Sequence, residues 1–324
     1  QYSDTDGSMN QSAGNGASVV LSNSTNETSD ITIGIDVSKF QGTIDWAQVA
    51  SSGVDFAMIR VGYRAQKTGV IYADTNAKYN MQQAAANGIK VGAYFFSSAV
   101  NEAEAIEEAD WVADFISDYS ITYPVAFDCE GFNTSESRQK SMTKAERTAV
   151  ATAFLQEVYD KGYTPMFYAA SSELTNNSQW NTASLENSYK IWVAQYPSTP
   201  YPETPSTSYT GTCSMWQYTN QGRVAGIGTN VDINVAYFGY SGTNGSLSGE
   251  TAAAASPDVE AGMVFTSVND TVTAKDEVRL RDKPSQDTDA AVITTLVNGE
   301  TVTRTGTSSS GWSRLVYNGQ TVYA

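Results

Sequence analysis

Two acidic residues close a short apolar segment near the middle of the chain. The run 124–127 (Pro-Val-Ala-Phe) is followed by Asp128, Cys129 and Glu130, and then by Gly131. A short apolar run that ends at glycine is typical of a buried strand. Side chains two residues apart share one face of a strand, with Cα atoms roughly 6.6 Å apart. Asp128 and Glu130 should therefore point the same way at the strand end, and Cys129 should point to the other face.

A pair of carboxylates placed in this way could hydrolyse a glycosidic bond. That reaction needs one carboxylic acid to protonate the leaving oxygen and a second group to stabilise or trap the oxocarbenium-like centre. Glu130 has the longer side chain and is the expected general acid, with Asp128 as the stabilising group. Because two neighbouring carboxylates cannot both ionise cheaply, one should keep its proton closer to neutral pH. The alternative is a solvated strand end that arises by chance in an acidic protein.

The residue types that are missing restrict the chemistry. The chain of 324 residues contains no histidine and only two cysteines, Cys129 and Cys213. A zinc site of the usual kind and the Ser-His-Asp or Cys-His mechanisms are therefore excluded, and we expect no metal and no cofactor. The two cysteines fall on different predicted strands, so a disulfide between them is the less favoured alternative.

Charge and composition indicate the kind of partner. The formal net charge is -16, with 35 acidic and 19 basic residues, which argues against nucleic-acid binding. No apolar stretch is long enough to span a membrane. Aromatic residues make up 11% of the chain, which suits either sugar binding or ordinary core packing. The Ser-, Thr- and Asn-rich composition and the start at Gln1 favour a processed, extracellular protein.

Further acidic residues interrupt predicted strands at two other places. Asp36 lies within the run 34–38 (Gly-Ile-Asp-Val-Ser), and Asp232 lies within 231–234 (Val-Asp-Ile-Asn). An unpaired carboxylate in an apolar core is costly, so both side chains should face a cleft. The alternative is that each pairs with a basic residue such as Arg60 as a structural ion pair.

Large aromatic residues occur in or beside the same predicted strands. If they face inward they could line a sugar-binding cleft, and if they face outward they pack against helices. The aromatic candidates for substrate binding are Tyr94, Tyr168, Trp192 and Trp216, and Arg60 is a further candidate for substrate binding.

Alternating strands and helices would position these residues. Helical patterns cover 45–52, 74–87, 101–119 and 143–160, and apolar strands cover 31–37, 56–61, 89–96, 123–128, 164–169, 190–194, 213–218 and 231–237. This alternation predicts parallel βαβ units. Eight strands without helices between the last ones predict an incomplete (β/α)8 TIM-like barrel of the α/β class. The active site of such a barrel lies at the carboxyl ends of its strands.

The composition divides the chain into four parts. Residues 1–30 read as a flexible polar arm, 31–240 as the barrel, and 241–262 as a linker rich in Gly, Ser and Ala. Residues 263–324 contain short strands at 278–281, 291–296, 300–305, 312–317 and 321–323, separated by turn signals such as Asn298-Gly299. They predict a small all-β barrel.

The ordered set of motifs over residues 31–240 resembles the glycoside hydrolase family 25 lysozymes. The matching pieces are Gly34–Ser38, Phe40–Gly42, Asp45-Trp46, Ile59-Arg60, Gly92–Phe96, Ala126–Glu130, Ile191–Ala194, Trp216–Tyr218 and Val231–Asn234. No single piece is specific, but their order is. Family members usually carry a histidine where this chain has Phe95.

This resemblance implies a muramidase that cleaves the β-1,4 linkage between N-acetylmuramic acid and N-acetylglucosamine in peptidoglycan, with retention. It implies Glu130 as proton donor and places Asp36, Asp128 and Asp232 in the cleft. Either the substrate's own N-acetyl group, oriented by Asp128, or a carboxylate would be the nucleophile. The C-terminal unit resembles bacterial SH3-like cell-wall-binding domains. The alternatives are a chitinase-like glycosidase and a catalytically silent wall-binding protein.

Overall fold

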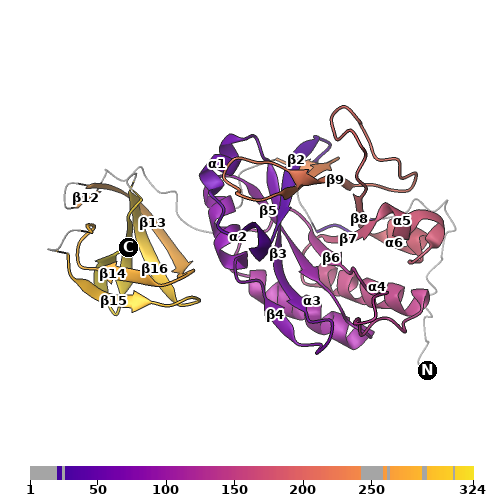
Figure 1. The fold of residues 1–324 in the computed structure, drawn as a ribbon, viewed down its shortest axis with the longest axis horizontal. Coiled ribbons are helices and arrows are strands. Elements are labelled where there is room, and N and C mark those ends of the chain that lie inside the picture. The colour runs from indigo at the N-terminus through magenta and orange to yellow at the C-terminus, as the bar shows by residue number, and fades with distance from the viewer. Residues whose placement is uncertain (1–19, 24–25, 242–257, 261–262, 287–289, 309–310) are drawn as a thin grey trace, which may run out of the picture.

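A computed structural model describes residues 20–23, 26–241, 258–260, 263–286, 290–308 and 311–324. A barrel with surrounding helices forms the larger unit, and a separate all-β unit lies beside it (Figure 1). The predicted arm over residues 1–19 and most of the predicted linker lie outside the described residues. The two units therefore correspond to the two folded parts that the sequence indicates.

Eight strands of the described region close the barrel. They are β2 (Thr32–Val37), β3 (Phe56–Arg64), β5 (Lys90–Phe96), β6 (Val125–Asp128), β7 (Pro165–Ala170), β8 (Lys190–Ala194), β9 (Met215–Gly222) and β10 (Val231–Ala236). They are hydrogen-bonded in this order, and β10 pairs back onto β2. Strands β2 to β9 run parallel, whereas β10 is antiparallel to both of its neighbours. The predicted barrel is confirmed, with its last strand reversed.

Helices cover the outside of the early part of the barrel. They are α1 (Trp46–Ser51), α2 (Ala77–Ala86), α3 (Glu102–Ile116), α4 (Lys144–Asp160), α5 (Ser171–Leu174) and α6 (Thr182–Ser188). The side chain of Asn101 caps α3, and Thr143 forms a capping box with Glu146 at the start of α4, which fixes where both helices begin. No helix of the described region lies between β8 and β10, as the sequence predicts. The short helices α5 and α6 were not predicted.

Aromatic side chains fill the end of the barrel where the parallel strands begin. The rings of Phe56 and Tyr123 stack with centroids 4.3 Å apart, and Phe238 and Tyr240 pack around Tyr123. Gly34 lies opposite Phe56, where an added Cβ would fall 2.3 Å from the ring, so only glycine fits. Aromatic side chains therefore close this end of the barrel.

The described residues near the chain start lie against the barrel. Strand β1 (Glu27–Thr28) pairs with β11 (Gly239–Tyr240), and the Glu27 carboxylate contacts Lys190 at 2.6 Å. The amide of Leu21 donates to the carbonyl of Ser188. The part of the predicted arm nearest the barrel is thus held by it.

The C-terminal unit is a seven-stranded antiparallel sheet in the described region. Its strands are β12 (Asp258–Glu260), β13 (Met263–Thr273), β14 (Val278–Arg281), β15 (Val292–Leu296), β16 (Thr301–Ser308), β17 (Ser313–Tyr317) and β18 (Gln320–Tyr323). Its core contains Leu280, Leu296, Val302, Leu315 and Val322. The five predicted strands are present, and β12 and β13 precede them.

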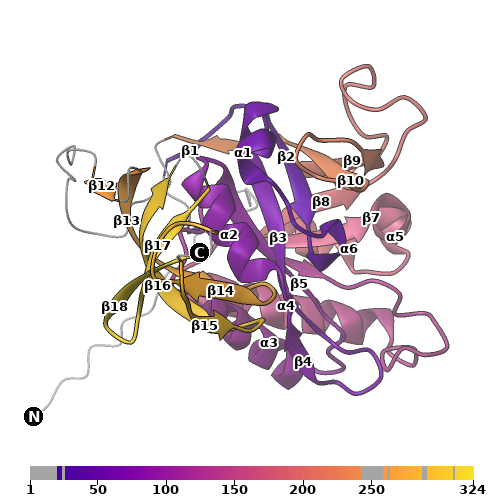
Figure 2. The same cartoon turned by 60° about the vertical axis from the view of Figure 1, so that its left-hand side comes forward.

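Few polar contacts join the two units, which meet beside α2 (Figures 1 and 2). The side-chain amide of Gln82 donates to Asp270 and to the carbonyl of Thr271. The ammonium of Lys275 donates to Thr43 Oγ1 at 3.1 Å and lies over the ring of Tyr79. The barrel therefore keeps its own core, and the second unit rests on its outer surface.

Candidate active site

Four carboxylates meet at the polar end of the barrel. Asp36 lies near the end of β2, Asp128 ends β6, and Glu130 follows it two residues later. Asp232 lies at the beginning of β10, not at its end, and pairs in register with Asp36. Because β10 is antiparallel, its first residues lie where the parallel strands end. The convergence that the sequence suggests is present, but a reversed strand brings Asp232 to it.

Asp128 and Glu130 lie close enough for each to change the proton affinity of the other. The two side chains are hydrogen-bonded, so they point the same way. Burial raises the pKa of Asp128 well above its ordinary value, and the neighbouring charge of Glu130 adds to this. Desolvation of its carboxyl group also raises the pKa of Glu130; the bond to Asp128 opposes this rise, and the charge of Asp232 adds to it. The pair therefore retains a proton at a pH where an isolated carboxylate would have lost it.

The backbone around this pair is fixed by neighbouring strands. The carbonyl of Asp128 accepts from the amide of Ser97 at 2.7 Å, and the carbonyl of Glu130 accepts from the side chain of Gln66 at 3.0 Å. Asp128 is only 6% exposed, whereas Glu130 is an exposed residue. Cys129 points to the opposite face and is buried near Gln139. Both cysteines are free thiols.

One oxygen of Asp128 has no partner among the described residues. Its Oδ1 is buried and makes no hydrogen bond. Burying a carboxylate oxygen without a hydrogen-bond donor is unfavourable, unless a bound ligand supplies the donor. The floor of the site therefore offers an acceptor to a bound donor group.

Asp36 lies at the centre of a second network. Its Oδ2 accepts from the side-chain amides of Gln217 at 2.9 Å and Asn234 at 2.8 Å. Burial and the charge of Asp232 raise the pKa of Asp36, although the two amide donors act against this. Arg60 does not pair with either of these two aspartates, because it binds Asp74 through Nε and Nη2. The alternative reading, a structural ion pair between Arg60 and Asp36 or Asp232, is therefore not found.

Sequence reasoning missed Gln217, the residue that organises this network. Its Oε1 accepts from the hydroxyls of Tyr168 at 3.1 Å and Tyr196 at 2.6 Å. An amide oxygen that accepts from two hydroxyls fixes the amide orientation, so Nε2 must donate to Asp36. Gln217 lies between Trp216 and Tyr218, and strand alternation alone could have placed it on the inner face.

Three of the four candidate aromatics lie inside the barrel. Tyr168 and Trp192 are register partners, with Tyr168 beside Asp128, and their rings meet edge to face at 4.8 Å. Tyr94 meets Trp192 at 6.1 Å. Trp192 also donates to Asn234 at 2.8 Å, which holds its ring in place. These side chains therefore pack inside the barrel beside the carboxylates.

Trp216 is not brought to the site. It is fully buried in a separate cluster with Tyr218 and Val235, on the outer face of β9. Its indole N–H donates to the carbonyl of Gln195. Phe95 also faces outward, where it packs against Trp111 and Phe154. Neither residue contacts the carboxylates.

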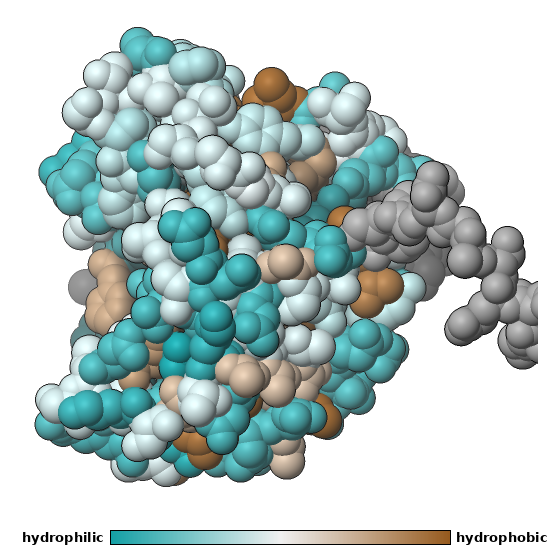
Figure 3. Space-filling view, turned by 90° about the vertical axis from the view of Figure 1, so that its right-hand side faces the viewer, coloured by the Kyte–Doolittle hydropathy of each residue, from teal (hydrophilic) through white to brown (hydrophobic). Residues whose placement is uncertain are grey.

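No metal-binding cluster of His, Cys, Asp and Glu side chains is found in the described parts of the chain. None of the described helices has the length and apolar character needed to cross a bilayer. The face that carries α4, α5 and α6 is mostly hydrophilic, with apolar residues in small scattered patches (Figure 3).

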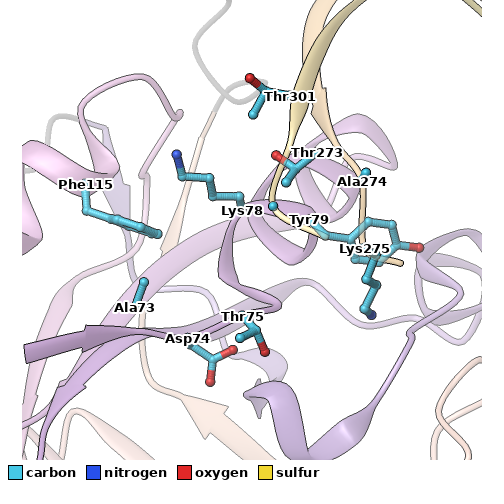
Figure 4. A pocket seen from close by; sticks show the side chains of 11 residues that line it. Ala73, Asp74, Thr75, Lys78, Tyr79, Phe115, Thr273, Ala274, Lys275 and Thr301 are labelled. Atoms are coloured by element: carbon cyan, nitrogen blue, oxygen red, sulfur yellow. The ribbon is translucent and has the colours of Figure 1, made fainter. Parts of the chain in front are cut away.

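A hollow of about 190 Å³ lies apart from the carboxylates, between the two units. Figure 4 shows Lys78 and Phe115 on one side of it and Tyr79 and Lys275 on the other. Both lysines lie over aromatic rings, at 5.4 Å for Lys78 over Phe115 and 4.8 Å for Lys275 over Tyr79. Residues of both units line the hollow, so we assign it to the junction between the units.

Two family models match the chain, one over the barrel and one over the C-terminal unit. The family model described as "Glycosyl hydrolases family 25" matches residues 35–227, which contain Asp36, Asp128 and Glu130. A second model, described as "Bacterial SH3 domain", matches residues 276–324. The first match covers more than half of the chain.

A curated relative and two solved structures resemble the chain. Lysozyme M1 of Streptomyces globisporus is 30% identical over 213 residues, which span 62% of this chain and 66% of that protein. The autolysin LytC of Streptococcus pneumoniae aligns with a TM-score of 0.52 at 24% identity, over 63% of this chain and 46% of that one. The spore cortex lytic enzyme SleM of Clostridium perfringens aligns with a TM-score of 0.52 at 17% identity, over 87% of this chain and 94% of that one. The two structural likenesses show a shared fold.

Proposed function

The chain belongs to glycosyl hydrolase family 25, and from this premise we propose that it is a lysozyme-type muramidase. Its reaction is hydrolysis of the β-1,4 linkage between N-acetylmuramic acid and N-acetylglucosamine in peptidoglycan. The observation that carries the proposal is the hydrogen-bonded Asp128–Glu130 pair, which faces the polar end of the barrel with raised pKa values. The similarity to lysozyme M1 supports it.

Glu130 is the general acid. It is the exposed member of the pair, so its carboxyl group can reach the glycosidic oxygen of a bound strand. Burial and the charge of Asp232 already raise its pKa, and a sugar that displaces water from it raises that pKa further. An acid that keeps its proton near working pH is what protonation of the leaving oxygen requires.

Asp128 orients the substrate and does not attack it. A carboxylate nucleophile is usually about 5–5.5 Å from its acid partner, leaving space for the sugar between them. Asp128 is instead hydrogen-bonded to Glu130, and its free Oδ1 can accept the N–H of an N-acetyl group. The acetamido oxygen then attacks the anomeric carbon, water opens the resulting ring, and the configuration is retained.

Asp36 and Asp232 supply negative potential beneath the reacting sugar. Their charges act on the catalytic pair, since Asp36 raises the pKa of Asp128 and Asp232 raises that of Glu130. The negative charge that Asp36 and Asp232 carry when one of them is ionised favours the positively charged oxocarbenium-like transition state over the neutral substrate. Tyr94 is the partly exposed aromatic residue of the three and can contact the sugar, whereas Tyr168 and Trp192 are buried and support the site from inside the barrel.

The C-terminal unit acts as a tether to the bacterial cell wall, and the protein works outside the cell. The match to a bacterial SH3 domain supports the first part. The acidic composition, which disfavours nucleic acids as partners, is compatible with an exported wall enzyme. A tether raises the local concentration of the barrel at its polymer without taking part in the reaction.

The test is digestion of purified peptidoglycan by the wild type and by Glu130→Gln. The variant should release new reducing ends at least roughly 100-fold more slowly, which is the usual range for loss of a general acid. Glu277→Gln, an exposed site in the C-terminal unit, is the matched control and should digest normally. Near-normal release by Glu130→Gln would refute the assignment.

A further inference from the structure

Two cations lie beside the candidate active site. Arg60 is the register partner of Tyr94 on the inner face of β3, and its charge acts on Asp128. Lys39 follows β2, and its ammonium lies 5.6 Å from the ring centroid of Phe40 and 5.5 Å from that of Tyr63. The guanidinium of Arg60 lies over the same two rings, at 5.0 and 5.6 Å. We call Lys39, Phe40, Arg60 and Tyr63 the cationic corner.

The cationic corner has binding capacity that the protein does not use. Arg60 donates from Nε and Nη2 to Asp74, but its Nη1 makes no hydrogen bond with any described residue. Lys39 forms no ion pair within the described part of the chain, although the protein carries 35 acidic residues. The ring of Phe40 is 69% exposed. An exposed ring between two cations, in a strongly acidic protein, is suited to an anionic ligand with an apolar face.

A hollow continues from this corner along the strand ends. It has a volume of about 410 Å³ and is lined by residues that include Tyr63, Gln66 and Phe96. Phe96 is the register partner of Asp128, and Gln66 donates to the carbonyl of Glu130, so the hollow adjoins the catalytic pair. Lys67 and Glu136 also line it, but they pair with each other and their charges cancel. Arg64 also lines it and is paired with Glu107 and Glu108, and Arg60 is paired with Asp74. The cation of this region without an ion pair among the described residues is therefore Lys39.

We propose that the cationic corner is a subsite for a peptide carboxylate of the substrate. It rests on the proposed function, since peptidoglycan carries peptides with free carboxylates on alternate sugars. Lys39 and the free Nη1 of Arg60 bind the carboxylate, Phe40 and Tyr63 cover the apolar part of the peptide, and the hollow receives its next residues. The corner thereby selects glycan strands that carry carboxylated peptides.

Binding measurements in a Glu130→Gln background test this without turnover. The probes are soluble glycan–peptide fragments with free carboxylates and the same fragments with those carboxylates amidated. Adding Lys39→Gln should weaken binding of the carboxylate form roughly fivefold, the size of one partly exposed charge pair, and leave the amidated form unchanged. Lys161→Gln, which removes a lysine after α4 at the far end of the barrel, is the control and should change neither.

Equal weakening for both probes would show a structural role for Lys39 and overturn the subsite, as would no weakening for either. Phe40→Ala provides a second reading and should weaken both forms, because stacking does not depend on charge. Cleavage of the fragments by the chain with Glu130 intact is measured separately. If Lys39→Gln cleaves the carboxylate fragments as fast as the wild type does, the subsite is refuted but the proposed function is not. If the wild type neither binds nor cleaves the fragments, the proposed function is refuted as well.

Discussion

At the scale of single residues, the site is built from carboxylates that the fold makes less acidic. Burial raises the pKa of Asp36, Asp128, Glu130 and Asp232. The charge of Asp232 further raises the pKa of Asp36, and the charge of Glu130 further raises that of Asp128. A folded state that binds protons more tightly than the unfolded state loses stability as pH rises from the ordinary carboxyl pKa of about 4 towards the raised value. The features that make the site useful therefore reduce the stability of the fold at neutral pH.

Asp128→Asn should show both effects. The amide removes a buried charge and can still bond to Glu130, so we expect a higher melting temperature at pH 7, by about 2–4 °C for each kcal/mol relieved. The gain should shrink as the pH falls towards 4, where the aspartic acid is neutral in both states. Turnover of peptidoglycan should fall at least roughly tenfold.

Thermal melts of Asp128→Asn between pH 4 and pH 8 measure this, with the exposed Asp114→Asn on α3 as control. If the variant melts at a lower temperature than the wild type at pH 7, the buried Asp128 carboxyl group does not lower the stability of the fold.

The sequence identified the carboxylates at this scale because each one interrupts an apolar run. It did not identify Gln217, Asn234 or Tyr196, because amides and phenols in strands are ordinary residues. Their roles depend on contacts across strands that lie far apart in the chain, such as the bond from Asn234 to Asp36. Trp216 illustrates the reverse error, since its type suggested sugar binding but strand alternation turns it outward.

At the scale of elements, the strand positions were predictable from the sequence, but the direction of the last barrel strand was missed. The segment between β9 and β10 runs from Arg223 to Asn230, too short for a parallel crossover, which needs a dozen or more residues. This length alone requires an antiparallel β10, and that direction brings Asp232 to Asp36. The short helix α6 was missed because it is polar and its cap residue makes no side-chain hydrogen bond.

Helix α3 is fixed to the catalytic end of the barrel by a buried group of side chains. Glu108 accepts from Arg64 at 2.7 Å and from Ser97 at 2.6 Å, and the amide of Ser97 donates to the carbonyl of Asp128. Burial raises the pKa of Glu108 to about 7, although both donors oppose the shift. Stability contributed by this residue therefore declines as pH rises from about 4.5 to 7.

Glu108→Ala should destabilise the protein by about 3 kcal/mol, because it leaves the buried Arg64 without its enclosed partner. Denaturant unfolding near pH 6 measures the loss. Glu108→Gln keeps the shape and one acceptor, so its loss should be smaller. If alanine and glutamine proved equally harmless, Glu108 would not be fixing α3 in place.

At the scale of the whole molecule, the two units are joined through few contacts. Among the described residues, Gln82 of α2 bonds to Asp270 and Thr271, and Lys275 bonds to Gly42 and Thr43 in the loop before α1. The change in composition predicts a second unit after the barrel, but the sequence did not predict β13 as a strand. None of the four carboxylates contacts the second unit through a hydrogen bond among the described residues.

Removal of residues 263–324 should therefore leave the chemistry intact. We expect cleavage of small soluble muropeptides within about twofold of the full chain, and markedly weaker co-sedimentation with insoluble walls. Loss of activity on the soluble fragments would show that the second unit completes the active site.

The most direct test of the central claim is mass spectrometry of the products released from purified peptidoglycan by the full chain. The account predicts disaccharide–peptide fragments that end in reducing N-acetylmuramic acid and are absent when Glu130→Gln is used. Fragments that end in reducing N-acetylglucosamine, or muramic acid ends that persist with Glu130→Gln, would contradict it.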